Sequence, residues 1–127
     1  MVVSTVAVVD ASAVAALLFN EPGSDDVAER FRHGRLVATS LLPYEVANVC
    51  VTKIRRYPDQ ERALLEAFSI LGALNIEIVT VPFDDIVELA CETGLTAYDA
   101  SYLWLARELR AVLVTLDRAL DSAWRTS

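Results

Sequence analysis

Four acidic residues lie near the points where predicted strands give way to helices: Asp10, Glu45, Asp99 and Asp117. Asp10 directly follows the apolar run at residues 5–9, and Asp117 follows the run at residues 111–116. In an open parallel α/β sheet, ligands gather at the edge formed by the carboxyl ends of the strands, so these carboxylates are expected to meet there. Four carboxylates repel one another unless a cation neutralises them, and such oxygen ligands suit Mg²⁺ or Mn²⁺. The pattern indicates a metal-dependent phosphoryl-transfer site.

Each acid also has a purely structural explanation at a helix N-terminus. Asp10 and Asp117 are suited to cap the helices that follow them. Glu45 lies in a first helical turn, where negative charge suits the helix dipole, and Thr96 with Asp99 matches a capping box. Asp99 is the least firmly placed, because a short segment separates it from any predicted strand. Caps explain the positions, but metal binding also explains why acids fill all four.

Predicted strands and helices alternate along the chain. Short β-branched runs predict strands, and apolar residues at helical spacing between Pro and Gly signals predict helices. We expect strands at residues 6–9, 36–39, 76–81 and 111–115, and helices at 12–19, 24–34, 43–56, 58–71, 83–91, 97–109 and 117–124. This alternation predicts an α/β fold with a mainly parallel sheet of four to five strands and helices on both faces. Without repeats or linkers, residues 1–127 are expected to form one domain.

The composition is apolar for a small domain, with 54% hydrophobic residues among 127 and a net charge of −7. Such an excess predicts a protein–protein interface, in a homodimer or with a dedicated partner. No stretch reaches the roughly 18 apolar residues of a membrane-spanning helix, and residues 1–9 are interpreted as a buried strand rather than a signal peptide. Cys50 and Cys91 are interpreted as reduced core thiols, which predicts a cytoplasmic protein.

The acidic balance argues against a simple nucleic-acid binder, but the basic residues are clustered. One cluster spans Arg30–Arg35 and another Lys53–Arg56, and ten of the eleven basic residues are Arg, which makes forked contacts with phosphate. Pairing with surface acids or with helix C-termini explains the same residues equally well. The only histidine, His33, lies far from the acids in sequence, which disfavours a metal-free, His-based hydrolysis of phosphodiesters.

Four sequence blocks resemble the motifs of PIN-domain ribonucleases, in order and over nearly the whole chain: VVDASA at 8–13, YEVAN at 44–48, AYDASYLWLA at 97–106 and VTLDRAL at 114–120. The chain looks most like the short, single-domain toxins of VapBC toxin–antitoxin systems. The resemblance implies a PIN-like three-layer α/β/α fold whose catalytic, metal-binding quartet is Asp10, Glu45, Asp99 and Asp117. It also implies Mg²⁺- or Mn²⁺-dependent endonucleolytic cleavage of RNA, a homodimer, and inhibition by a cognate VapB-like antitoxin.

Within this resemblance, the direct metal ligands are expected to be Asp10, Asp99 and Asp117. Glu45 is expected to bind the metal through water or to act as the base for the attacking water. Ser12 and Thr115 match small hydroxyl positions beside the first and last acids, where they either orient carboxylates or water or serve as core or cap hydroxyls. Asp121, one helical turn beyond Asp117, is a candidate fifth acid whose default interpretation is solvated surface charge.

Several other interpretations compete with this one. The apolar helical pair at residues 46–54 and 64–71 either exposes a surface for dimerisation or an antitoxin, or simply covers the sheet. A receiver-like domain would need a lysine at the end of a late strand, but the only lysine, Lys53, lies in a predicted helix. A doubly wound phosphatase would need a second acid two residues after Asp10, where Ser12 stands. A catalytically silent PIN-like scaffold that binds RNA or supports assembly is the remaining alternative, and the intact quartet argues against it.

Overall fold

The computed structural model describes residues 5–126, so the first part of the strand predicted at residues 1–9 lies outside the described residues. The elements follow the predicted alternation: β1 (Val6–Val9), α1 (Ala11–Leu18), α2 (Ser24–Phe31), β2 (Arg35–Thr39), α3 (Leu42–Arg56), α4 (Glu61–Ser69), β3 (Glu77–Val79), α5 (Phe83–Thr93), α6 (Ala97–Leu109), β4 (Val112–Val114) and α7 (Arg118–Arg125). Two 3₁₀ turns, Pro58–Gln60 and Ile70–Leu74, flank α4. The single helix predicted at 58–71 is therefore wrong in its extent. Pro58 supports only a tight first turn, and the following strand is reached through the left-handed residue Asn75.

All four strands are parallel, in the order β3-β2-β1-β4. Val8 in β1 pairs with Val37 of β2 on one side and with Leu113 of β4 on the other. The carboxyl ends of the strands consequently face the same edge. Residues 7–9 of β1 are buried, as is typical of a central parallel strand covered on both faces. The predicted α/β fold with a parallel sheet is confirmed.

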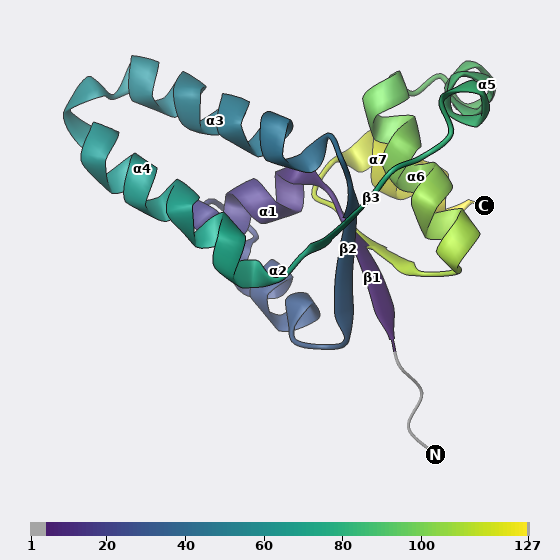
Figure 1. Cartoon of the computed structure of the whole chain (residues 1–127), viewed down its shortest axis with the longest axis horizontal. Helices are drawn as coiled ribbons and strands as arrows, with labels where there is room; N and C mark the ends of the chain where they lie inside the picture. The colour runs from purple at the N-terminus through teal and green to yellow at the C-terminus, as the bar shows by residue number, and fades with distance from the viewer. Residues whose placement is uncertain (1–4, 127) are drawn as a thin grey trace.

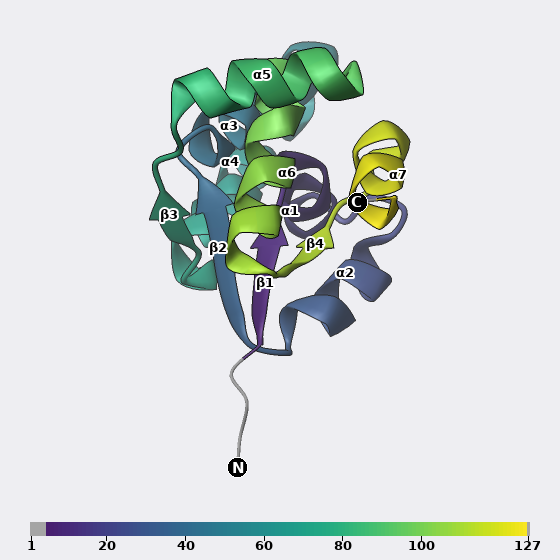
Figure 2. The same cartoon turned by 90° about the vertical axis from the view of Figure 1, so that its right-hand side faces the viewer.

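Helices cover both faces of the sheet, which gives the predicted three layers. In Figure 1 the sheet stands between α1–α4 on one side and α5–α7 on the other. Figure 2 shows α6 in front of the sheet, with α5 across its upper end. The core where the layers meet contains fully buried side chains such as Val14, Val46, Leu103 and Leu120. Each such side chain stabilises the fold by roughly 1.5–3 kcal/mol relative to an exposed one.

Helices α3 and α4 run side by side and project away from the sheet (Figure 1). Val46 and Cys50 of α3 are buried, but α4 has no buried residue, and its Leu65 is 52% exposed. Helix α4 therefore packs against the core only in part, through the partly buried Phe68. Cys50 is a buried free thiol as predicted, whereas Cys91 is exposed on the outer side of α5, contrary to the prediction of two core thiols. Within residues 5–126, no helix is long and apolar enough to cross a membrane.

Candidate functional site

The four sequence-predicted acids line one pocket at the carboxyl edge of the sheet. Asp10 follows β1 and caps α1, whereas Asp117 follows β4 and caps α7. Glu45 and Asp99 lie in the first turns of α3 and α6. The fold thus brings together residues that are more than 100 positions apart in the sequence, because each occupies the start of a helix that begins at this edge.

Asp10 is the most firmly held of the four carboxylates, with 3% of its surface exposed. Its Oδ1 accepts hydrogen bonds from the Ala13 backbone N–H at 3.0 Å and from Ser12 Oγ at 2.7 Å. Its Oδ2 accepts a hydrogen bond from Thr115 Oγ1 at 2.5 Å. Ser12 and Thr115, left open between orienting and structural roles, therefore both orient the Asp10 carboxylate. They also tie α1 to the segment after β4, because Ser12 Oγ accepts from the Leu116 N–H.

Glu45 is held from across the pocket by a tyrosine. The Tyr102 hydroxyl, from a buried side chain on α6, donates to Glu45 Oε1 at 2.8 Å. This bond joins α3 to α6 across 57 sequence positions, and it fixes one carboxylate oxygen. The sequence patterns assign no functional role to Tyr102. Its four-residue spacing from Tyr98 is equally typical of packing, so the sequence held no signal that separates the two roles.

Asp99 and Asp117 complete the pocket with less backbone support. The Asp99 N–H donates to Thr96 Oγ1 at 3.1 Å, so Thr96 caps α6 as the predicted capping box requires. Asp117 Oδ1 accepts the Leu120 N–H at 2.9 Å as the cap of α7. The capping interpretation is therefore correct for Asp10 and Asp117, and it coexists with their position in the pocket.

The pocket disfavours the ionised form of its own carboxylates. Burial raises the pKa of Asp10, and the nearby Asp99 adds to this, while hydrogen bonds from Thr115, Ala13 and Ser12 oppose it. Burial also raises the pKa of Glu45, with further contributions from Asp10 and Asp99 and an opposing one from the Tyr102 hydroxyl. The pKa of Asp99 is raised by burial and then by the charge of Asp117. Three neighbouring carboxylates with raised pKa values mark a buried site in which positive charge would favour the ionised forms.

Among residues 5–126, no basic side chain forms an ion pair with these carboxylates. The ion pairs formed among residues 5–126 involve seven basic residues, and none includes one of the four pocket acids. Asp121, the candidate fifth acid, lies outside the pocket and pairs with Arg125 at 2.9 Å, so it is a surface acid as the default interpretation held. A cation from solution would supply positive charge to the pocket.

The donor set fits a hard divalent cation. Carboxylate oxygens dominate the pocket, and the Asn48 side-chain amide and the Ser12 hydroxyl add neutral oxygens. Mg²⁺ and Mn²⁺ prefer such ligands. Among the described residues, no three acidic, His or Cys side chains are close enough together to form a complete ligand set. The quartet therefore supplies convergent charge, and a bound ion would need small side-chain movements and water to complete its coordination.

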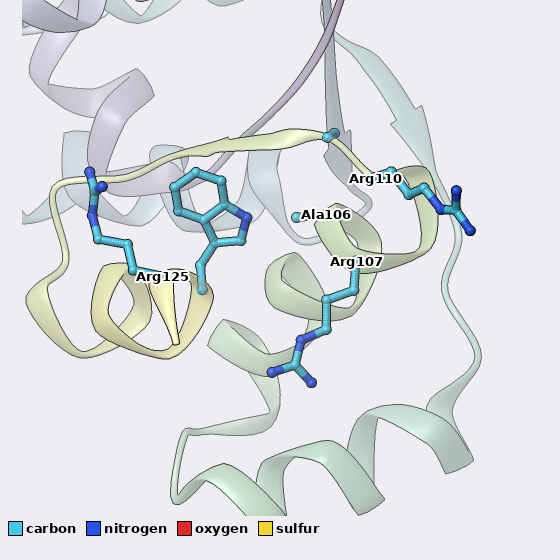
Figure 3. A pocket seen from close by; sticks show the side chains of 6 residues that line it. Ala106, Arg107, Arg110 and Arg125 are labelled. Carbon is cyan, nitrogen blue, oxygen red and sulfur yellow. The ribbon is translucent and has the colours of Figure 1, made fainter. Parts of the chain in front are cut away.

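A second hollow lies at the other end of α6 and has a different chemistry. It is lined by Ala106, Arg107, Arg110, Ala111, Trp124 and Arg125. Figure 3 shows the side chains of Arg107, Arg110 and Arg125 pointing in three different directions rather than toward one point. No carboxylate lines this hollow, so it offers no comparable place for a metal ion.

A family model and one curated relative match nearly the whole chain, and a second relative matches about a third of it. The model described as PIN domain matches residues 7–124. Ribonuclease VapC3 of Pyrobaculum aerophilum is 35% identical over 118 residues, which cover 89% of this chain and 90% of the relative. A shorter match, 51% identical over 39 residues, covers 31% of this chain and 29% of Exonuclease VapC9 of the same organism.

Solved structures share the fold. The crystal structure of PAE2754 from Pyrobaculum aerophilum superposes with a TM-score of 0.74 and 30% identity, over 91% of this chain and 77% of that one. VapC20 of Mycobacterium tuberculosis, described as a sarcin–ricin loop cleaving toxin, superposes with a TM-score of 0.64 at 18% identity, over 92% and 94% of the two chains. Together with the family match, these similarities show that the chain belongs to the PIN domain family.

Proposed function

We propose that this chain is a divalent-metal-dependent endoribonuclease, a single-domain toxin of a type II toxin–antitoxin pair. The observation that carries the proposal is the pocket itself, into which four elements direct carboxylates that no basic side chain among the described residues neutralises. The 35% identity to a protein named Ribonuclease VapC3 supports RNA as the substrate. A silent scaffold would have no use for three carboxylates with raised pKa values, which cost stability.

In this mechanism the metal would be held by Asp10, Asp99 and Asp117. Asp10 is kept in one orientation by its three hydrogen bonds, so it would hold its position when substrate binds. Bound Mg²⁺ or Mn²⁺ would lower the pKa of a coordinated water and neutralise charge on the scissile phosphate.

Glu45 would accept the proton of the attacking water. Its raised pKa makes it a stronger proton acceptor than an ordinary surface carboxylate, and the Tyr102 hydroxyl occupies only Oε1. The other oxygen is then available to the water. Glu45 would thus act as the general base rather than bind the metal through water.

A homodimer and a VapB-like antitoxin are the proposed partners, in a cytoplasmic setting. Exposed apolar side chains support an interaction with other chains. Tyr44, Phe83, Val87 and Tyr98 are 58–81% exposed. Leu65 of α4 and Ile70 of the following 3₁₀ turn are 52% and 49% exposed. Light scattering after size-exclusion chromatography of the antitoxin-free protein measures the oligomeric state, and a monomer at micromolar concentration would rule out the homodimer.

Cleavage of RNA by the purified, antitoxin-free protein tests the activity. Total cellular RNA and a circular RNA are incubated with Mg²⁺, with Mn²⁺ or with EDTA. A circular RNA has no ends, so only an endonuclease opens it, and this separates the proposal from the exonuclease activity named for the shorter relative. Asp10→Asn controls for contaminating ribonucleases, and Asp121→Asn is the matched acid-to-amide change outside the pocket.

We expect discrete, metal-dependent products and opening of the circle by the wild type and by Asp121→Asn, with no products from Asp10→Asn. Intact RNA under every condition, from protein that is folded by circular dichroism, would favour the scaffold alternative. Cleavage of linear RNA alone would indicate an exonuclease.

A further inference from the structure

Another pocket, separate from the hollow beside Arg107, adjoins the acidic pocket along α3. The two pockets share Asn48 and Val49, so they adjoin on this side of α3, and together they are called the α3 groove below. Glu45 lies at one end of this groove, and Arg56 and Tyr57 lie at the other. The lining residues recur at three- and four-residue intervals, which places them on one face of the helix.

The far end of the groove is basic and aromatic. The Arg56 guanidinium lies 5.5 Å from the centroid of the Tyr57 ring, and that tyrosine is 42% exposed. Arg56 takes part in none of the ion pairs formed among residues 5–126. Lys53 also lines this end, but its ammonium already pairs with Glu21 at 3.1 Å. Arg56 is therefore the cation of the groove that is free to bind an anion.

We propose that Arg56 and Tyr57 form a subsite for the RNA strand, in which Arg56 binds a backbone phosphate and Tyr57 stacks on an unpaired base. This proposal rests on the proposed function, since it places the scissile phosphate at the four acids. Arginine binds phosphate through a planar fork, and aromatic rings stack on unpaired bases of any sequence.

The geometry sets which phosphate is bound. Arg56 lies eleven positions after Glu45 in α3, which corresponds to roughly 17 Å along a helix that rises about 1.5 Å per residue. That span exceeds one nucleotide, so the bound phosphate belongs to a nucleotide further along the strand and not to the cleaved linkage. An RNA strand that runs along α3 would consequently be bound at a point outside the acidic pocket. Inside the pocket, the carboxylates repel its phosphates.

The other basic cluster, Arg30–Arg35, is excluded as the RNA-binding subsite by its ion pairs and by its position. Arg30 pairs with Asp26, Arg32 with Glu29, and Arg35 with Glu77. Arg35 opens β2, so this cluster lies at the amino edge of the sheet, opposite the acidic pocket. The structure therefore favours the Lys53–Arg56 cluster over the Arg30–Arg35 cluster as the RNA-binding site, a choice that the sequence left open.

Arg55 provides a matched control for the test. It lies in the same last turn of α3 and is exposed, but it lines neither pocket. A general effect of positive charge at the helix C-terminus would be shared by Arg55 and Arg56, whereas binding in the groove depends on Arg56 alone. Tyr57→Phe retains the aromatic ring, whereas Tyr57→Ala removes it.

The experiment measures binding of a fluorescein-labelled, single-stranded 12-nucleotide RNA by anisotropy, with Mg²⁺ at several salt concentrations. All variants carry Asp10→Asn, so that the RNA stays intact. We expect Arg56→Gln to raise Kd roughly tenfold and to reduce the slope of log Kd against log salt by about 0.7, the value for one lost phosphate contact on a single strand. Tyr57→Ala should raise Kd about fivefold or more through lost stacking, while Tyr57→Phe and Arg55→Gln change it less than twofold.

In the otherwise wild-type protein, Arg56→Gln should raise KM for cleavage with little change in kcat, because the subsite binds ground state and transition state alike. Equal effects of Arg55→Gln and Arg56→Gln, or no effect of Arg56→Gln on Kd and KM, would overturn the subsite. Absence of cleavage by the wild type, with the Arg56-specific loss of binding intact, would instead overturn the proposed function and leave a nucleic-acid-binding groove.

Discussion

Replacing Tyr102 with phenylalanine tests whether the hydroxyl that holds Glu45 matters for catalysis. The substitution deletes one hydrogen bond of 2.8 Å to a carboxylate and leaves the buried ring in place. Hydrogen bonds to charged groups contribute about 1.5–3 kcal/mol, but Glu45 is only half-buried, so water replaces part of the lost bond. We expect a loss of about 1 kcal/mol in the free energy of unfolding, which corresponds to a Tm decrease of roughly 3–6 °C for a chain of this length.

We expect Tyr102→Phe to lower the activity more than the stability of the fold, and to change the pH dependence of kcat. Loss of positioning should lower kcat about tenfold, or about 1.4 kcal/mol. Glu45 must be ionised to accept a proton, so activity falls as pH decreases through its pKa. The Tyr102 hydroxyl lowers the pKa of Glu45, so its removal should move the acidic limb of the kcat profile to higher pH.

The assay is cleavage of a fluorogenic RNA across the pH range, with Tyr98→Phe as the control. Tyr98 lies one turn earlier on α6, is 59% exposed, and does not line the acidic pocket. An acidic limb that stays in place in Tyr102→Phe, or an equal shift in Tyr98→Phe, would refute the positioning role of Tyr102.

Three further predictions concern the pocket and the turn before β2. Divalent metal should raise the Tm of the wild type and of Asp121→Asn but not of Asp10→Asn, because metal at 100 times its Kd contributes about 2.7 kcal/mol to stability. Differential scanning fluorimetry measures these Tm values. An equal rise in Asp10→Asn would contradict the role of Asp10 as a metal ligand. In EDTA, the raised pKa of Asp10 means that the folded state binds its proton more tightly than the unfolded state, so this residue costs stability progressively as pH rises above its ordinary pKa of 3.8. Asp10→Asn should therefore gain stability relative to the wild type between acidic and neutral pH, as measured by urea unfolding, and a constant difference would refute the sign. Gly34→Ala should lower the free energy of unfolding by about 2 kcal/mol more than Gly94→Ala. Both glycines have positive φ, but only a Cβ at Gly34 would lie 1.9 Å from the Thr5 carbonyl oxygen. Equal decreases in Tm for the two variants would contradict this clash.

Local sequence patterns predicted the order of the elements because each pattern is produced by the element itself. Helix α6 begins and ends at the predicted residues, since Thr96 caps its start and its apolar face is continuous. The strands were located by β-branched runs, although β3 is shorter than the predicted 76–81 and spans Glu77–Val79. The parallel direction of the strands then follows from the helix that connects each strand to the next.

Contacts between distant elements had no such local signature. The hydrogen bond between Tyr102 and Glu45 depends on how α3 and α6 are placed across the sheet, and neither segment alone encodes it. The groove along α3 depends on which side of that helix faces solvent beside the acids, so adjacent Arg55 and Arg56 look equivalent in sequence. Cys91 was assigned to the core from an apolar stretch, but α5 turns that side outward.

The competition between capping and metal binding at the four acids is resolved by the topology. Strands β1, β2 and β4 lead into α1, α3 and α7 at the pocket edge, and α6, which follows α5, also begins there, so the N-termini of these four helices are near the pocket. A helix N-terminus carries roughly half a positive charge, which partly offsets the repulsion among carboxylates gathered there. Asp10 and Asp117 each use one oxygen to cap a helix, and that bond fixes the carboxylate in the pocket. The helix starts thus hold in place the acids that a metal ion would need. Burial is the largest cause of the raised pKa values of Asp10, Glu45 and Asp99, and neighbouring carboxylates add to it, so a divalent cation bound in the pocket would stabilise their ionised forms.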